Sequence, residues 1–141
     1  VALPLLCELQ EGKAHIVGIC SLATNAPFPK AEAYGSSKAA LRYFLESLAL
    51  DLQLENIDVT VVQPGFVKTP LTDKNDFSMP FLLGSDEAAA RIIKGISKRP
   101  RVFSFPKRLS YALKISRVLP RLWEKLMVVD IKKNQQVGGQ Q

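Results

Sequence analysis

The chain has 141 residues, of which 47% are hydrophobic and 23% charged, an ordinary composition for one globular domain. Its two cysteines, Cys7 and Cys20, have no metal-ligand or disulfide-framework spacing, and no run of about 18 apolar residues could span a bilayer. The net charge of +6 is uneven, because residues 1–90 carry 6 Lys or Arg against 11 Asp or Glu, whereas residues 91–141 carry 13 against 2. This composition excludes a disulfide scaffold, a membrane span and a wholly disordered chain, and we expect a cytoplasmic protein without a metal site.

The first residues have the pattern of an interrupted domain. Residues 1–13 read as the last turns of an apolar helix followed by a polar stop, which is an unusual beginning for a domain. We therefore expect that the front part of the domain is missing from this sequence. Residues 14–20 form a short apolar run rich in β-branched residues and predict a buried strand, and residues 21–33 predict a loop.

A long helix and a second strand follow. Mostly apolar residues recur at helical spacing from position 34 to about 55, and Asn56 is the predicted end of the helix. The positions that recur are Ala39, Ala40, Tyr43, Phe44, Ser47, Leu48, Leu52 and Leu54. Residues 57–63 predict another β-branched strand, which ends at Pro64 and Gly65. Such a βαβ unit is almost always parallel and right-handed, so the sequence predicts an α/β fold.

The remaining elements are predicted as a loop, a helix, a strand and an amphipathic helix, at residues 66–84, 85–98, 101–105 and 107–128. Pro120 should kink or divide the last helix. The polar residues 129–141 predict a disordered tail. We expect residues 1–128 to form the C-terminal portion of a single domain.

Three polar features converge on one edge of the predicted sheet. Tyr34 and Lys38 are four residues apart on one helix and so share a face, although such a pair arises readily by chance. Ser21 directly follows the first strand, and Pro64 and Gly65 close the next one. The carboxyl ends of parallel strands form the rim where open α/β sheets bind ligands. The sequence therefore predicts a site at this rim.

These residue types suit proton and charge chemistry at a carbonyl group. A phenol is a weak acid at neutral pH, and a neighbouring ammonium group favours its phenolate form. A serine hydroxyl can donate a hydrogen bond to a carbonyl oxygen that gains charge during a reaction. Ser21, Tyr34 and Lys38 are therefore the candidate catalytic residues.

The spacing also matches a known pattern. Tyr34 follows Ser21 by thirteen residues, and Lys38 lies within YGSSKAAL. This arrangement resembles the active-site pattern of the short-chain dehydrogenase/reductase family, and the segment from position 64 to 69 resembles that family's PGxVxT segment. The resemblance extends over residues 1–70 and more loosely beyond them. It implies the C-terminal part of a Rossmann-type doubly wound parallel sheet, without the glycine-rich cofactor-binding half that precedes it in the family.

The resemblance implies an oxidoreductase that interconverts an alcohol and a carbonyl by hydride transfer with NAD or NADP. Tyr34 would be the general acid/base, Lys38 would hold the nicotinamide ribose and Ser21 would orient the substrate. The implied cofactor contacts are Tyr34, Lys38, Pro64, Gly65, Val67 and Thr69. The family commonly forms homodimers or homotetramers. Because the first half of the cofactor site is missing, we expect this chain alone to be inactive.

Two further features bear on the substrate. The family often has glycine where this chain has Thr24, a change that is expected to narrow the site without removing a catalytic group. Residues 71–83 correspond to the family's variable substrate-covering loop. The apolar residues of this loop favour a lipophilic substrate and are Phe77, Met79, Phe81, Leu82 and Leu83.

Other functions stay open. The basic helix at 107–125, with Trp123 on its apolar side, is compatible with lying on an anionic membrane surface in a non-catalytic module. Packing of the apolar stripe against the domain is the more common arrangement. No recognition motif accompanies the charge, which argues against nucleic acid. A sugar-nucleotide epimerase or dehydratase can share YxxxK, but the PGxVxT segment argues against it.

Overall fold

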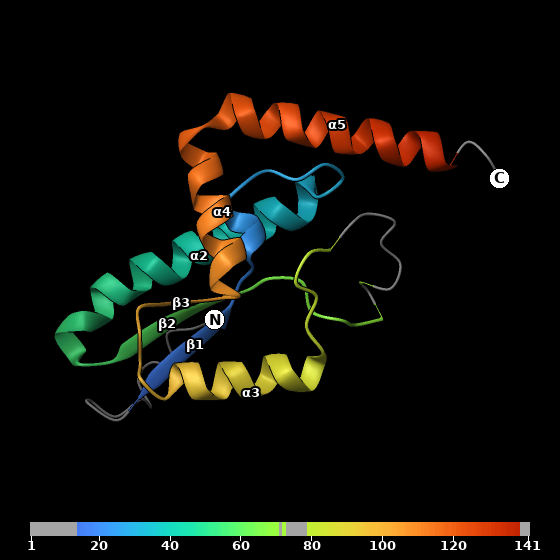
Figure 1. Ribbon diagram of the computed structural model, residues 1–141. Coiled ribbons are helices and arrows are strands. Elements are labelled where there is room, and N and C mark those ends of the chain that lie inside the picture. The colour runs from blue at the N-terminus through green and yellow to red at the C-terminus, as the bar shows by residue number, and fades with distance from the viewer. Residues whose placement is uncertain (1–13, 71, 73–78, 139–141) are drawn as a thin grey trace.

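The computed structural model describes residues 14–70, 72 and 79–138, with side chains to residue 129. Its centre is a three-stranded parallel sheet in the order β1-β2-β3 (Figure 1). The strands are β1 (His15–Ile19), β2 (Asp58–Pro64) and β3 (Val102–Phe105). At the carboxyl edge Ile19 pairs with Val62, and Pro64 pairs with Phe105. The predicted strands and their parallel arrangement are confirmed.

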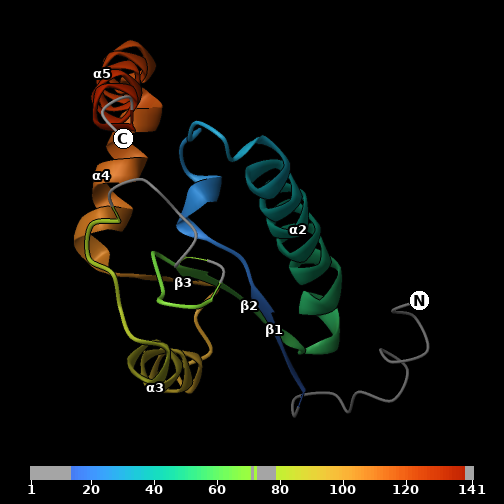
Figure 2. The ribbon, with the colours of Figure 1, turned by 90° about the vertical axis from the view of Figure 1, so that its right-hand side faces the viewer.

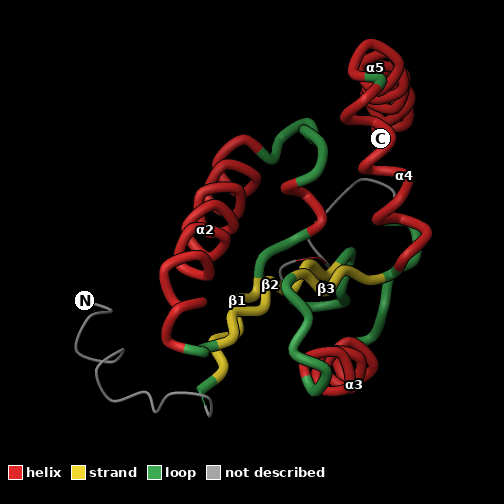
Figure 3. Tube along the Cα trace, turned by 90° about the vertical axis from the view of Figure 1, so that its left-hand side faces the viewer, coloured by secondary structure: helices red, strands yellow, loops and turns green. Residues whose placement is uncertain are grey.

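Helices cover both faces of this sheet. In Figure 2 α2 lies on one side of the strands and α3 on the other. The helical elements are η1 (Leu22–Thr24), α2 (Glu32–Asp51), η2 (Leu52–Glu55), α3 (Ser85–Ile96), α4 (Lys107–Val118) and α5 (Pro120–Gly138). The tube in Figure 3 shows the same layering, with α4 leading away from the end of β3. The arrangement confirms the predicted α/β fold.

Alternation along β2 builds a separate core on each face. Val59 and Val61 pack with Leu45 of α2 in one cluster. Val62 packs with Ala88 of α3 in another. Successive strand residues point to opposite faces, so a nearly continuous apolar strand serves both helices. This double burial fixes the register that brings the strand ends to a common rim.

Two residues explain how α2 fits against the sheet. Gly18 in β1 has no side chain, and a Cβ atom there would collide with Leu45. The helix is therefore seated close to β1. Asn56, the predicted stop, follows η2 in the left-handed conformation with φ 53°. Asn tolerates this conformation better than most residues and turns the chain back into β2.

The inward side of α2 differs from the expected one. Leu45 and Ala49 are buried against the sheet, whereas Tyr43 is 75% and Phe44 53% exposed. Leu41, Leu45 and Ala49 have helical periodicity, as do the positions predicted from the sequence. Only packing in the folded domain decides which of the two stripes faces the sheet. The helix was predicted correctly, but part of its inward face was not.

The C-terminal helices also depart partly from expectation. Pro120 does divide the amphipathic stretch into α4 and α5. The disordered tail expected from residue 129 is instead helical through Gly138. Its Lys, Asn and Gln residues extend a helix that is already formed, which costs far less than starting one. The expectations for residues 1–13 lie outside the described residues, and no described helix is long and apolar enough to cross a membrane.

Candidate active site

Lys38 connects the end of β1 with Tyr34. Its Nζ donates a hydrogen bond of 3.2 Å to the carbonyl oxygen of Ile19, the last residue of β1. The same Nζ lies 5.9 Å from the centroid of the Tyr34 ring, within the range of a cation–π contact. The two side chains share a face one helical turn apart. The structure thus brings Tyr34 and Lys38 together at the rim.

Ser21 lies two residues beyond Ile19 and is the N-cap of η1. Its backbone is extended, and its Oγ accepts a hydrogen bond of 3.1 Å from the Ala23 amide. The residue is buried, with 8% of its surface exposed. None of the described residues accepts a bond from its hydroxyl proton, so that proton is available to a substrate oxygen.

Tyr34 lies in the first turns of α2 and is more open. About half of its surface is exposed (47%), and Ser37 donates to its backbone carbonyl at 2.8 Å. Among the described hydrogen bonds, none joins Tyr34 directly to Ser21; Lys38 and Ile19 lie between them. The three predicted catalytic residues therefore gather at one rim without forming a closed triad.

Pro64 and Gly65 lie at the matching end of β2. Pro64 is the last residue of the strand, and the Gly65 amide donates to Phe105 at 2.8 Å. A Cβ atom at Gly65 would lie 3.0 Å from Pro106 and 3.1 Å from Leu109. The glycine therefore lets the strand end pack closely beneath the start of α4.

Val67 and Thr69 begin the loop that leaves the rim. Val67 forms a parallel bridge with Leu83, so the loop returns beside its own start. The Thr72 hydroxyl donates to the Val67 carbonyl at 3.0 Å. The Thr69 amide donates to the Thr72 Oγ1 at 2.7 Å. These bonds hold the predicted cofactor-contacting segment in a compact turn near the end of β2.

The sequence did not predict the contact that covers the loop between Ser21 and Tyr34. The Trp123 Nε1 of α5 donates to the Pro27 carbonyl at 2.7 Å, and its ring meets Phe28 edge-to-face at 5.4 Å. Leu109 and Leu113 of α4 are buried in the same cluster. The apolar stripe predicted Trp123 as a packing residue, but no local signal identifies a partner 96 positions away.

Cys20 precedes Ser21 and is a packing residue. It is 3% exposed, and burial raises the pKa of its thiol. The positive charges of Lys38 and Arg42 act in the opposite direction but do not cancel this shift. A raised pKa disfavours the nucleophilic thiolate. The interpretation of Cys20 as a small buried residue, rather than a nucleophile, agrees with this environment.

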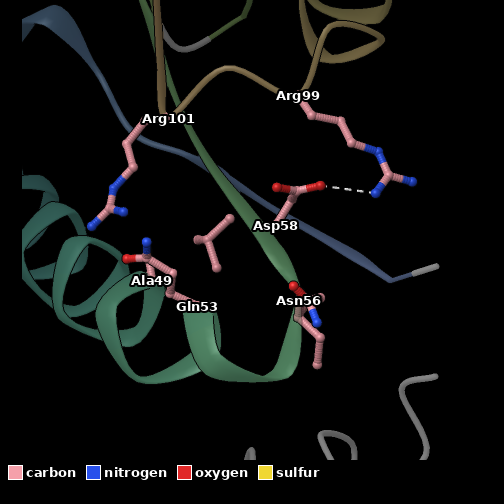
Figure 4. Close-up of a pocket in the computed structure, with 8 residues that line it drawn as sticks. Ala49, Gln53, Asn56, Asp58, Arg99 and Arg101 are labelled. Carbon is pink, nitrogen blue, oxygen red and sulfur yellow. Dashed lines mark hydrogen bonds and ion pairs between the residues drawn. The ribbon is translucent and has the colours of Figure 1, made fainter. Parts of the chain in front are cut away.

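A cavity of about 500 Å³ lies at the opposite end of the sheet (Figure 4). Its lining includes Gln53, Asn56 and Asp58, where the chain enters β2, and Arg99 and Arg101, where it approaches β3. Arg99 is held by Asp58 at 2.9 Å. None of the predicted site residues lines this cavity. The amino ends of the strands are therefore separate from the rim that carries Ser21, Tyr34 and Lys38.

Comparison with known families identifies the chain. The family model of short chain dehydrogenases matches residues 1–78. The chain belongs to the short-chain dehydrogenase/reductase family. An uncharacterized oxidoreductase of Myxococcus xanthus is 41% identical over 118 residues, which is 84% of this chain and 46% of the relative. The 11-beta-hydroxysteroid dehydrogenase-like protein 3 of Arabidopsis thaliana is 31% identical over 120 residues, 82% of this chain and 38% of the relative.

Solved structures of this family agree with the fold of the chain. A short chain dehydrogenase of Burkholderia cenocepacia, solved in complex with NADP, is 26% identical with a TM-score of 0.57. The match covers 73% of this chain and 48% of that one. The chain thus spans less than half the length of these proteins, and its sheet is the C-terminal part of a Rossmann-type sheet. The predicted family and fold class are confirmed.

Proposed function

We propose that the full-length protein is an NAD- or NADP-dependent oxidoreductase that interconverts an alcohol and a carbonyl, with Tyr34 as general acid/base. The observation that carries this proposal is the position of Lys38, which bonds to the end of β1 and lies beside the Tyr34 ring. Family membership and the NADP complex of the Burkholderia cenocepacia relative support the choice of cofactor.

The donor set at the rim suits a nicotinamide cofactor. An ammonium group carries three N–H donors, and Ile19 takes one from Lys38. The other two are free, among the described residues, for the hydroxyl oxygens of a ribose. Val67 and Thr69 at the end of β2 provide backbone and hydroxyl groups for the carboxamide. When bound, the cofactor supplies or accepts the hydride.

Tyr34 would move the proton that accompanies the hydride. In the reducing direction its Oη gives a proton to the carbonyl oxygen, and in the oxidising direction it takes one from the alcohol. The Lys38 ammonium stabilises the negative charge that remains on the phenolate oxygen. The half-exposed Tyr34 side chain leaves the reacting oxygen room to approach.

Ser21 would orient the reacting oxygen. Its Oγ already accepts from Ala23, which leaves the hydroxyl proton to donate to the substrate. A donor fixed before the reaction stabilises developing negative charge without reorganisation, an effect that is typically worth a few kcal/mol. Ser21 and Tyr34 would then hold one substrate oxygen from two sides.

A lipophilic substrate fits the loop beside the rim. Phe81 and Leu82 are 50% and 42% exposed where the chain returns toward Leu83. Exposed aromatic and aliphatic side chains beside a polar reaction centre favour an apolar substrate body. Phe77 of the same loop lies outside the described residues. We propose a lipophilic alcohol or ketone as the substrate.

A homodimer or homotetramer built on α2 remains the proposed assembly, because Tyr43 and Phe44 lie outward on that helix. The membrane-surface alternative has less support. Trp123, the natural interfacial anchor of the basic helix, is bonded to Pro27 and packed on Phe28. The half-exposed Leu122 and Leu126 of α5 are the residues that still favour this alternative.

The test compares Tyr34→Phe with Tyr43→Phe in the full-length protein. Both substitutions remove one phenol oxygen from an exposed tyrosine of α2, but only Tyr34 is at the rim. Turnover of a panel of steroid, fatty and small polar alcohols is followed through the absorbance of the reduced nicotinamide. Tyr34→Phe should lower kcat by about a hundredfold or more, as expected for loss of general acid/base catalysis.

Tyr43→Phe should leave kcat within about twofold, since Tyr43 is away from the site and phenylalanine keeps the ring that an interface on α2 would bury. Equal turnover by both variants would remove Tyr34 from the chemistry. Turnover of the polar alcohols alone would contradict the lipophilic substrate while leaving the reaction class in place.

A further inference from the structure

A chain of hydrogen-bonded side chains, two of them buried and the third partly exposed, joins β3 and β2 to the loop that carries Ser21. Ser104 donates from its hydroxyl to the Gln63 Oε1 at 2.9 Å. The Gln63 Nε2 donates to the Thr24 Oγ1 at 2.8 Å. The Thr24 hydroxyl donates to the Ser21 carbonyl oxygen at 2.9 Å, and the Thr24 amide donates to the same oxygen at 3.2 Å. We call these three side chains, Ser104, Gln63 and Thr24, the relay.

The direction of every bond in the relay is determined by its last acceptor. A carbonyl oxygen only accepts, so the Thr24 hydroxyl must donate its single proton to Ser21. Thr24 Oγ1 must then accept from Gln63, which places the Gln63 NH₂ group toward Thr24 and its oxygen toward Ser104. No other amide orientation satisfies both neighbours.

Burial makes the relay stiff. Gln63 is 1% and Ser104 4% exposed, so water does not compete for their bonds. An unpaired polar group at either position would lose its full solvation, and in a low-dielectric interior each bond strengthens the next. The Ser21 carbonyl is therefore held against two strands of the sheet rather than by its own loop alone.

We propose that the relay positions Ser21 for catalysis, with Thr24 and Gln63 as positioning residues. This inference rests on the proposed function, since it assumes that the Ser21 hydroxyl contacts the substrate oxygen. The relay fixes the Ser21 carbonyl while Ala23 fixes its Oγ. Both ends of the residue are thus held, and its hydroxyl proton keeps one direction. The family often has glycine at the position of Thr24, and glycine has no hydroxyl that could make these bonds. Thr24 therefore has a positioning role in this chain that glycine could not have.

The test uses Thr24→Val in the full-length protein, because valine keeps the branched shape and removes the hydroxyl. Thr24→Ser restores the hydroxyl and serves as the rescue. Thr60→Val is the matched control, because Thr60 is a fully buried hydroxyl in β2 that bonds to Pro100 at the other end of the sheet. Steady-state kinetics give kcat and KM at saturating cofactor.

Thr24→Val should lower kcat about tenfold with KM changed less than twofold. A less well positioned Ser21 hydroxyl would weaken stabilisation of the transition state more than binding of the substrate. Thr24→Ser should recover most of the activity, and Thr60→Val should keep the wild-type kcat. In a Ser21→Ala background, Thr24→Val should cause no further loss, because the relay would have no hydroxyl left to position.

Equal kcat losses for Thr24→Val and Thr60→Val would overturn the proposal, as would an undiminished loss in the Ser21→Ala background. If Thr24→Val does not fold, Ser104→Ala replaces it, with an expected loss of about threefold in kcat; an unchanged kcat there overturns the relay. If the wild type shows no turnover, the proposed function fails separately. Hydrogen exchange of the amides of residues 21–25 then reports whether the relay restrains this segment. Thr24→Val must accelerate this exchange more than Thr60→Val does.

Discussion

At the scale of single residues, polar side chains at both ends of the sheet are fixed by partners from distant parts of the sequence. At the carboxyl end, Lys38 bonds across 19 positions to Ile19. At the amino end, the His15 Nε2 lies 2.8 Å from the Thr60 Oγ1, which itself donates to Pro100 at 2.6 Å. Thr60 therefore accepts from His15, so the imidazole carries its proton on Nε2.

His15 makes stability depend on pH. Its pKa is lowered from 6.5, mainly by burial and then by the Arg99 charge, while Asp58 opposes the shift. Because the folded pKa lies below the unfolded value, protonation favours the unfolded chain. The contribution of neutral His15 to the free energy of unfolding is fully present above pH 6.5 and declines as the pH falls below that value.

The change His15→Gln tests this dependence, because glutamine keeps an amide N–H for Thr60 but does not titrate. Denaturant unfolding of the full-length protein at about pH 7.5 and about pH 5.5 gives the two free energies. The wild type should lose more stability than His15→Gln between these pH values. A wild-type loss no larger than that of the variant would show that His15 does not contribute.

The candidate site residues could be proposed from the sequence, but the contacts that support them could not. Ser21, Tyr34 and Lys38 could be proposed as candidates because their spacing is short and the strand–helix order places them at one rim. The relay was not found, since Gln63 and Ser104 are ordinary strand residues whose meeting depends on sheet register. Side-chain contacts between distant segments leave no periodic signal in a sequence.

At the scale of elements, the C-terminal pair of helices covers the loop between Ser21 and Tyr34. α4 buries Leu109 and Leu113, and α5 places Trp123 on Pro27 and Phe28. This contact gives the basic C-terminal region a structural role beside the site. It fastens the part of the loop around Pro27 and Phe28, where the Ala31 amide also donates to the Phe28 carbonyl oxygen at 3.3 Å.

Trp123→Phe separates the hydrogen bond of this contact from its packing. The variant keeps an aromatic ring against Phe28 and loses the Nε1 donor to Pro27, so the free energy of unfolding should fall by about 1 kcal/mol. Amide exchange of residues 25–31 in the full-length protein should become faster. Tyr111→Phe, an exposed aromatic of α4, is the control and should change neither quantity. Unchanged exchange in Trp123→Phe would mean that α5 does not restrain the loop.

Periodicity determined how well each element could be predicted. β1 and β2 are short apolar runs rich in β-branched residues, and α2 carries a 3.6-residue pattern. The boundaries of the strands and of α2 and α3 agree with the structure within a few residues. The inward face of α2 was ambiguous, because Tyr43 and Phe44 extend the apolar surface beyond the stripe that Leu45 and Ala49 form. The helical residues 129–138 were missed, because a polar composition does not distinguish a continued helix from a tail.

At the scale of the whole molecule, β1 is an edge of the described sheet. The order β1-β2-β3 leaves one side of β1 unpaired among the described residues, and Ile19 is 44% exposed. An unpaired strand edge presents backbone N–H and C=O groups to which another strand can pair. The chain spans less than half the length of its curated relatives, so experiments on activity belong with the full-length protein.

Hydride transfer at this rim is tested most directly by following an isotope from substrate to cofactor. The full-length protein is incubated with NAD or NADP in oxidised form and the best alcohol of the panel, deuterated at its carbinol carbon. Mass spectrometry of the recovered cofactor should find the deuterium on the nicotinamide ring, at a rate that Tyr34→Phe lowers about a hundredfold. Oxidation of the alcohol with no label in the cofactor, or equal transfer by Tyr34→Phe, would contradict the account.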